Sequence, residues 1–300
     1  MAAKTGASAP NLQEIHDCFL ELAKQAGDMI TGAKPLINAA GSKKNSSDLV
    51  TETDRAVELM VSTALRTKYP DYEFMGEESY EPGKRLTSAP TFIVDPIDGT
   101  VNFVHSFPNA CISLGFAIDR KPVVGVVFNP FTNTLYSAIR GQGAFLNRTT
   151  KLPLRGDNIE PLKGLSNALV GVEWGSDRHG PNWETKIGTF ERLGKAREEG
   201  GAMVHSMRSM GSAALNLCAV AAGYMDIYWE GGCWAWDVCA GWVILAEAGG
   251  IMVDGNPGGW EAEVDGRRYL AVRASKNSEG QKEIVQEFWK QIKGKFDYGQ

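Results

Sequence analysis

The stretch Ile93-Val94-Asp95-Pro96-Ile97-Asp98-Gly99-Thr100 is the most informative part of this chain, because a short apolar run ends there at two carboxylates three residues apart. This order predicts a buried strand that carries two oxygen ligands at its carboxyl end, with backbone N–H groups just beyond them. Such ligands suit metal ions, and free N–H groups suit a phosphate. Asp-Pro and Asp-Gly are also common turn dipeptides, so the motif taken alone favours a plain turn after a buried strand.

The composition describes a folded protein with an acidic balance. The chain has 300 residues, of which 43% are hydrophobic and 22% charged, and its formal net charge is −5. This length allows one large domain or two intimate ones. A general nucleic-acid binder usually carries a basic excess, so no nucleic-acid partner is expected. If the substrate is anionic, bound cations must reverse the local charge.

The cysteines and the polarity of the chain indicate where the protein works. The five cysteines are odd in number and lie mostly in apolar segments, which favours buried thiols in a reducing compartment. No Cys/His spacing suggests zinc. The first eleven residues lack the apolar core of a signal peptide, and no run reaches the length of a membrane span. We therefore expect a cytoplasmic protein with no membrane partner.

The first half of the chain predicts two helices followed by an antiparallel sheet. Apolar residues recur with helical spacing over residues 12–29, and a second helix should begin after Thr53 as its N-cap. The polar residues 41–47 predict a mobile surface loop, and the glycine-rich residues 141–145 predict a turn. Apolar runs separated by turn residues predict an antiparallel meander of strands at 91–94, 111–119, 122–129 and 134–139.

The second half alternates strands and helices without a long linker, which predicts a layered α/β protein. We expect residues 1–10 to form a flexible tail, 11–155 an N-terminal half with the acidic motifs, and 156–300 a C-terminal half, the two halves forming one compact unit. The predicted strands of the second half are 168–173, 202–206, 225–229 and 269–274. The predicted helices are 182–197, 211–222, 236–248 and 280–293.

Acidic residues stand beside apolar elements at three further places. Glu77 follows a short predicted strand, Asp237 begins a predicted helix, and Asp54 lies at the start of another. Each has a simple structural explanation when taken alone: Asp is a favoured N-cap, an acid at a helix start favours the dipole, and an acidic turn is often just solvated. Their combination with Asp95 and Asp98 is harder to explain by structure alone.

These acidic residues lie in four motifs, which in chain order are Asp48-Leu49-Val50-Thr51-Glu52-Thr53-Asp54, Gly76-Glu77-Glu78-Ser79, Asp95-Pro96-Ile97-Asp98-Gly99-Thr100 and Trp236-Asp237-Val238-Cys239-Ala240-Gly241. The motifs and their order resemble the inositol monophosphatase family of magnesium-dependent, lithium-sensitive phosphatases. The resemblance implies an α/β fold of alternating helix and sheet layers, an αβαβα sandwich, and a homodimer. It also implies hydrolysis of phosphate monoesters, with myo-inositol monophosphate as the expected substrate.

The resemblance also implies a role for each site residue. Glu77, Asp95 and the Ile97 carbonyl resemble the ligands of a first magnesium, and Asp95, Asp98 and Asp237 those of a second. Glu77 can reach a third, weaker magnesium, and Li⁺ is an expected inhibitor. Thr100 and Asp54, together with Glu77, resemble the residues that position and activate the attacking water. The implied substrate-binding residues are Asp98, Gly99, Thr100, Gly211, Ser212, Ala213, Glu230 and Asp237.

Two alternatives remain open on the sequence. A sister phosphatase acting on fructose 1,6-bisphosphate or 3′-phosphoadenosine nucleotides would share the Asp95–Thr100 motif. A catalytically silent relative could instead bind a small phosphate or sugar acid and regulate a pathway. The Trp-rich segment 229–236 departs from the animal enzymes, and within it Trp234 is the residue expected to reshape the sugar pocket. We therefore expect this segment to influence the substrate range.

Overall fold

The computed structural model describes residues 9–33, 41–42 and 49–299. Most of the predicted N-terminal tail and of the predicted loop at 41–47 lies outside these residues. Residues 41–42 form a short strand, however, so the loop prediction was wrong there: β1 (Gly41–Ser42) pairs antiparallel with β2 (Leu49–Val50).

The first half of the chain builds a seven-stranded sheet, and the second half builds a five-stranded one. In the larger sheet β3 is parallel to β4 and all other neighbours are antiparallel, which confirms the predicted meander. The strands of the larger sheet, in spatial order, are β3 (Glu73–Gly76), β4 (Thr91–Asp98), β5 (Cys111–Ile118), β6 (Lys121–Asn129), β7 (Thr134–Ile139), β8 (Ala144–Leu146) and β9 (Thr150–Lys151). Those of the smaller sheet are β11 (Ser206–Arg208), β10 (Leu169–Val172), β12 (Ile227–Gly231), β14 (Arg268–Val272) and β13 (Ile251–Val253).

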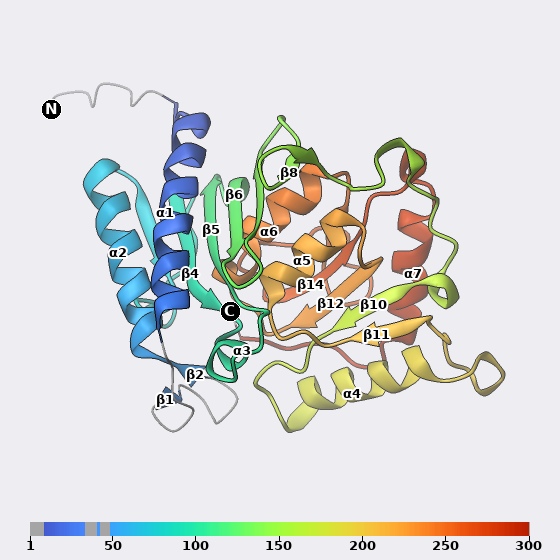
Figure 1. The fold of residues 1–300 in the computed structure, drawn as a ribbon. Helices are drawn as coiled ribbons and strands as arrows, with labels where there is room; N and C mark the ends of the chain where they lie inside the picture. The colour runs from blue at the N-terminus through green and yellow to red at the C-terminus, as the bar shows by residue number, and fades with distance from the viewer. Residues whose placement is uncertain (1–8, 34–40, 43–48, 300) are drawn as a thin grey trace, which may run out of the picture.

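Helices cover and separate the two sheets (Figure 1). The larger sheet packs its outer face against α1 and α2, and the smaller sheet packs its outer face against α4 and α7. Two apolar helices, α5 and α6, fill the space between the sheets. The layers therefore form the predicted αβαβα sandwich. The helices are α1 (Leu12–Gly32), α2 (Glu52–Lys68), α3 (Thr100–Val104), α4 (Gly180–Gly194), α5 (Ala213–Ala222), α6 (Ala235–Glu247) and α7 (Gln281–Gln291).

The central helix α6 lies unusually close to the larger sheet. A Cβ placed on Gly125 of β6 would lie 2.4 Å from the backbone oxygen of Ala240 in α6, which only a glycine permits. The residues of α6 that face the sheets are apolar and buried, including Cys239, Val243 and Ile244. This close packing fixes the start of α6 beside the end of β4, where the acidic motif lies.

Several element boundaries differ from the sequence prediction for local reasons. The N-cap of α2 is Thr51 and not Thr53, because the Thr51 side chain accepts hydrogen bonds from the backbone N–H groups of Thr53 and Asp54. The prediction of a strand at 202–206 was also wrong. The N–H groups of Ala202 and Val204 donate to carbonyls at the end of α4, so the sheet begins only at Ser206.

Two smaller differences concern strands that sequence periodicity missed. The glycine-rich turn ends at residue 143, after which β8 starts, and the three-residue β13 was not predicted. Among the described helices, none is both long enough and apolar enough to cross a bilayer.

Candidate active site

A β-bulge in β4 gives the acidic motif its shape. Asp95 pairs with Ser113 of β5, and Asp98 pairs with Cys111, so Pro96 and Ile97 together oppose a single residue. In a regular strand, residues three apart point to opposite faces of the sheet. The extra residue of the bulge brings Asp95 and Asp98 to the same face. The prediction of a turn at this motif was therefore wrong, and the prediction of a strand that delivers two carboxylates was right.

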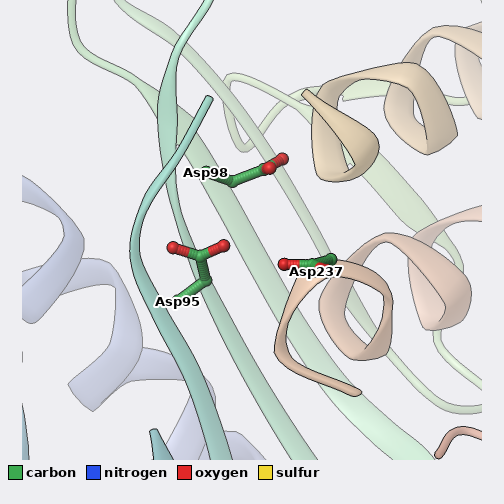
Figure 2. Close-up of side chains that lie close together, drawn as sticks. All are labelled: Asp95, Asp98 and Asp237. Carbon is green, nitrogen blue, oxygen red and sulfur yellow. The ribbon is translucent and has the colours of Figure 1, made fainter. Parts of the chain in front are cut away.

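A third carboxylate reaches this pair from the first turn of α6. Asp237 Oδ2 accepts a hydrogen bond of 2.7 Å from the backbone N–H of Trp234, which holds the side chain at the helix start. Oxygen atoms of Asp95, Asp98 and Asp237 all lie within 4.8 Å of one another. Figure 2 shows the three side chains converging from β4 and α6. We call these three residues the aspartate cluster.

Burial raises the pKa of every carboxyl group in the aspartate cluster, and the charges of neighbouring carboxylates within it add to the shift for Asp95 and Asp237. The pKa of Asp95 lies well above its usual value because of burial, followed by the charges of Glu77, Asp98 and Asp237. Burial also raises the pKa of Asp98 to about 6, although hydrogen bonds oppose the shift. Burial, followed by the charge of Asp98, raises the pKa of Asp237 well above its usual value. Closely spaced carboxylates of this kind fit a divalent cation, which would relieve the repulsion.

The start of α5 holds Asp98 in place. Its Oδ2 atom accepts hydrogen bonds from the Ser212 hydroxyl at 2.6 Å and from the Ala214 N–H at 2.7 Å. Ser212 is at the same time the N-cap of α5, because its Oγ accepts from the N–H of Leu215. Ser212, one of the residues 211–213 predicted to line the substrate pocket, therefore also orients a member of the aspartate cluster, together with the adjacent Ala214.

Thr100 and Asp54 meet beside the bulge, although 46 residues separate them in the chain. The Thr100 hydroxyl lies 3.2 Å from Asp54 Oδ1 and 3.1 Å from the Ile97 carbonyl oxygen. Its single proton can serve only one of these acceptors at a time. Asp54 is itself fixed by the N–H of Thr51, which donates to its Oδ2 atom at 2.9 Å. Gly99 takes φ +90°, a left-handed conformation that lets the chain leave β4 and enter α3 at once.

Glu77 follows β3 and lines a cavity next to the aspartate cluster. Its N–H donates to the Val94 carbonyl at 3.2 Å, which keeps it next to the end of β4. The turn behind it is supported by Glu58, whose carboxylate accepts the N–H of Glu78 at 2.6 Å. After burial, the charge of Glu77 is the largest cause of the raised pKa of Asp95.

The aspartate cluster opens into a cavity of about 970 Å³ between the two sheets. Glu230, at the end of β12, lines this cavity and is buried. The Tyr228 hydroxyl donates to its Oε2 atom. Burial and the charge of Glu173 raise the pKa of Glu230 to about 7, against the opposing effect of Lys186. A cavity of this size, with one acidic and one polar wall, suits a small polar ester.

Comparison with known proteins identifies the family. The model of the inositol monophosphatase family matches residues 11–293. The chain belongs to this family. Inositol monophosphatase 2 of Saccharomyces cerevisiae is 46% identical over 297 residues, covering 96% of this chain and 98% of the relative. Inositol monophosphatases hydrolyse phosphate monoesters, so this family membership makes the protein a phosphoric monoester hydrolase.

Solved structures share the fold of this family. The inositol monophosphatase of Anabaena (Nostoc) sp. PCC 7120 superposes with a TM-score of 0.74 and 29% identity, over 95% of this chain and 98% of that one. SaIMPase-II with bound inositol monophosphate gives a TM-score of 0.69 and 26% identity, over 92% and 94%. The same enzyme is also known with 2′AMP bound.

The structure brings the residues predicted from the inositol monophosphatase resemblance to one place. Asp95 belongs to the aspartate cluster, and the buried Ile97 and Asp54 lie behind it, in contact with Thr100. The other predicted residues all line the cavity: Glu77, Asp98, Gly99, Thr100, Gly211, Ser212, Ala213, Glu230 and Asp237.

Sequence reasoning missed several cavity residues. Glu173 is buried and accepts hydrogen bonds from the N–H groups of Met210 and Gly211 and from the amide of Asn216. It follows a buried apolar run of residues directly, as Asp95 does, and this signal could have revealed it. Lys186, Arg267 and Tyr298 also line the cavity but come from elements with no local motif, so only the fold brings them there.

Proposed function

We propose that this protein hydrolyses myo-inositol monophosphate to myo-inositol and phosphate by direct attack of water. The observation that carries the proposal is the position of the aspartate cluster beside a cavity that Glu230 and Ser212 also line. A cluster of carboxylates can hold the cations that an anionic ester needs, and the polar wall offers partners for ring hydroxyls. Family membership and the relatives that carry this activity in their names support the substrate.

The aspartate cluster and its neighbours form a suitable donor set for two or three Mg²⁺ ions. Glu77, Asp95 and the Ile97 carbonyl would hold one, and Asp95, Asp98 and Asp237 another. Bound magnesium supplies an activated water and screens the leaving alkoxide. We further propose that Li⁺ inhibits by occupying the second site.

The protein's own groups orient the reactants. The Thr100 hydroxyl and Asp54 position the attacking water and remove its proton, with Glu77 assisting. The N–H groups of Gly99 and Thr100 bind phosphoryl oxygens, since backbone N–H groups aimed at developing negative charge need no reorganisation. Glu230 and residues 211–213 bind the hydroxyls of the ring.

The activity is tested by measuring phosphate release with and without Mg²⁺. The substrates are myo-inositol 1-phosphate, fructose 1,6-bisphosphate and 3′-phosphoadenosine 5′-phosphate, compared at equal concentration. We expect the inositol ester to have the highest kcat/KM. A higher value for either other substrate would favour a sister phosphatase, and no release from any phosphate ester would favour a silent regulator.

Adding Mg²⁺ should raise the melting temperature of the wild-type protein, because the ion binds the folded state and relieves repulsion in the aspartate cluster. A ligand at 100 times its Kd stabilises a protein by about 2.7 kcal/mol, which corresponds to several degrees for a protein of this size. Differential scanning calorimetry at rising Mg²⁺ concentrations measures the shift. Asp237→Asn should lose most of it, and Asp157→Asn at an exposed position should keep it. Equal shifts in both variants would contradict the metal assignment.

The pH dependence of KM should report on Glu230. Because its pKa is raised to about 7, the group is protonated below this pH and ionised above it. The ionised form accepts stronger hydrogen bonds from ring hydroxyls, so KM for inositol 1-phosphate should fall as the pH rises through 7. Glu230→Gln should raise KM by about tenfold at pH 8 and remove this step, with little change in kcat. A pH profile of KM with the same step in Glu230→Gln would assign it to another group, such as the phosphate of the substrate.

The proposal also covers the location of the protein, its assembly and the division of its chain. We propose a cytoplasmic homodimer whose partners are small phosphate monoesters, and a division of the chain into halves near residue 155. The strands of the larger sheet all precede residue 152, and those of the smaller sheet all follow residue 168, which supports this division. Size-exclusion chromatography with light scattering tests the homodimer.

A further inference from the structure

A segment beyond the family match closes one wall of the cavity. The match ends at residue 293, and the chain continues past α7 along the smaller sheet. We call residues 294–298 the C-terminal strap. Its residue Phe296 is buried and stacks on Trp229 of β12, with ring centroids 4.7 Å apart and an interplanar angle of 23°.

Two asparagine side chains fix the backbone of the C-terminal strap. Asn256 accepts from the N–H of Phe296 at 2.8 Å and donates to its carbonyl at 3.0 Å. Asn182 does the same for Asp297, at 2.8 Å and 2.9 Å. Each amide thus forms the pair of hydrogen bonds that a neighbouring strand would form, and the two asparagines come from separate segments, one from α4 and one from the loop after β13. The strap is therefore held in one position and is not a loosely attached tail.

This position puts Tyr298 into the wall of the cavity, next to Glu230. A Cβ on Gly232 would lie 3.1 Å from the Tyr298 ring and 3.4 Å from its hydroxyl, so the ring rests on the backbone that follows Glu230. The ring also lies 5.9 Å from Lys186 Nζ and 5.2 Å from Arg267 Cζ. Both cationic side chains line the same cavity.

The Tyr298 hydroxyl has no hydrogen-bond partner among the described residues, although the side chain is only 8% exposed. A buried hydroxyl without a partner is unfavourable, and native structures usually have a reason for keeping one. The surrounding groups are those that bind a polyol: a carboxylate, two cations and the face of Trp234, on which Arg267 stacks at 3.6 Å. A ring hydroxyl is the partner that this wall lacks.

We propose that the C-terminal strap is a substrate-recognition wall and that the Tyr298 hydroxyl hydrogen-bonds a hydroxyl of the polyol ring. The proposal rests on the proposed phosphatase function but concerns binding of the ring and not the reaction at phosphorus. Tyr298 is therefore a specificity-determining residue that leaves the hydrolytic step unaffected.

The test compares a polyol ester with an ester that has no hydroxyls. We would measure kcat and KM of the full-length protein for myo-inositol 1-phosphate and for p-nitrophenyl phosphate. Tyr298→Phe, which removes only the hydroxyl, should raise KM for the inositol ester by about three- to tenfold and leave kcat within about twofold. Its constants for the aryl ester should not change. Tyr224→Phe, at an exposed tyrosine outside the cavity, should behave as the wild type.

A second variant tests the strap itself. Asn182→Ala removes both hydrogen bonds to Asp297 and should raise the same KM selectively. The proposal is overturned if KM for the inositol ester stays unchanged in Tyr298→Phe or in Asn182→Ala, or if both esters are affected equally. Hydrolysis of the aryl ester but not of the inositol ester by the wild type would refute the proposed substrate instead. The effect of Tyr298→Phe on KM would then be measured with the polyol phosphate that the wild type hydrolyses with the highest kcat/KM.

Discussion

Asp98→Asn should lower kcat for inositol monophosphate by about 100-fold or more, the scale of removing one electrostatic group from a catalytic site, while the protein stays folded. Asp98 belongs to the aspartate cluster, and the substitution removes a negative charge that a cation needs. The shape of the side chain is kept, so the carbonyl oxygen of the asparagine can still accept the Ser212 hydroxyl and the Ala214 N–H. Steady-state kinetics with saturating Mg²⁺ measure the loss.

The same variant should not destabilise the metal-free protein. Burial raises the pKa of Asp98 to about 6, so the ionised carboxylate destabilises the folded state as the pH rises through this value. Asparagine removes that penalty at pH 7, and the melting temperature without Mg²⁺ should stay equal or rise. Asp157→Asn, at an exposed position, is the control for a simple change in net charge. Near-normal kcat in Asp98→Asn would remove this residue from the catalytic machinery.

The parts of the fold that sequence reasoning predicted are those with local causes. The helix α1 and the meander follow from the spacing of apolar residues, because one buried face repeats every 3.6 or every 2 residues. The correct N-cap of α2 could also have been predicted from the sequence, since Thr51 and Asp54 have the spacing of a capping box. The error came from choosing among several threonines without applying that pattern.

The bulge in β4 could not be predicted in this way. Its register depends on pairing with β5, in which Asp95 and Asp98 oppose Ser113 and Cys111. The local sequence contains the turn-forming dipeptides Asp95-Pro96 and Asp98-Gly99, and taken alone it therefore favours a turn. The family resemblance pointed to Asp95 and Asp98 as a pair without giving the geometry that brings them to one face of the sheet.

The cavity residues also fall into two groups: those that could be predicted from the sequence and those that only the fold brings to the cavity. Glu230 and Ser212 were predicted from the family resemblance, whereas Lys186, Arg267 and Tyr298 were not predicted. These three come from a helix, a strand boundary and the C-terminal strap. No spacing in the sequence connects these three residues. The cavity wall formed by these three residues is therefore the part of the site that only the folded structure reveals.

Thr100→Val should lower kcat by about 100-fold or more and leave KM within about threefold, because the hydroxyl acts on the attacking water and not on the substrate. Valine has nearly the shape of threonine, so the start of α3 should be preserved. The contacts of Thr100 are the reason to expect that the hydroxyl and Asp54 act together. If a metal ion takes the Ile97 carbonyl, the hydroxyl proton is left to Asp54 Oδ1 at 3.2 Å, and the lone pairs of Oγ1 then face the water.

Thr100→Ser is the matched rescue for this experiment, since it keeps the hydroxyl and removes only a methyl group. It should retain most of the wild-type kcat, and Thr149→Val at an exposed threonine should retain all of it. Asp54→Asn should resemble Thr100→Val, and the double variant should be little worse than either single one, because residues that act as a unit are not additive. If the two losses multiply in the double variant, Thr100 and Asp54 contribute independently and the proposed pair is wrong.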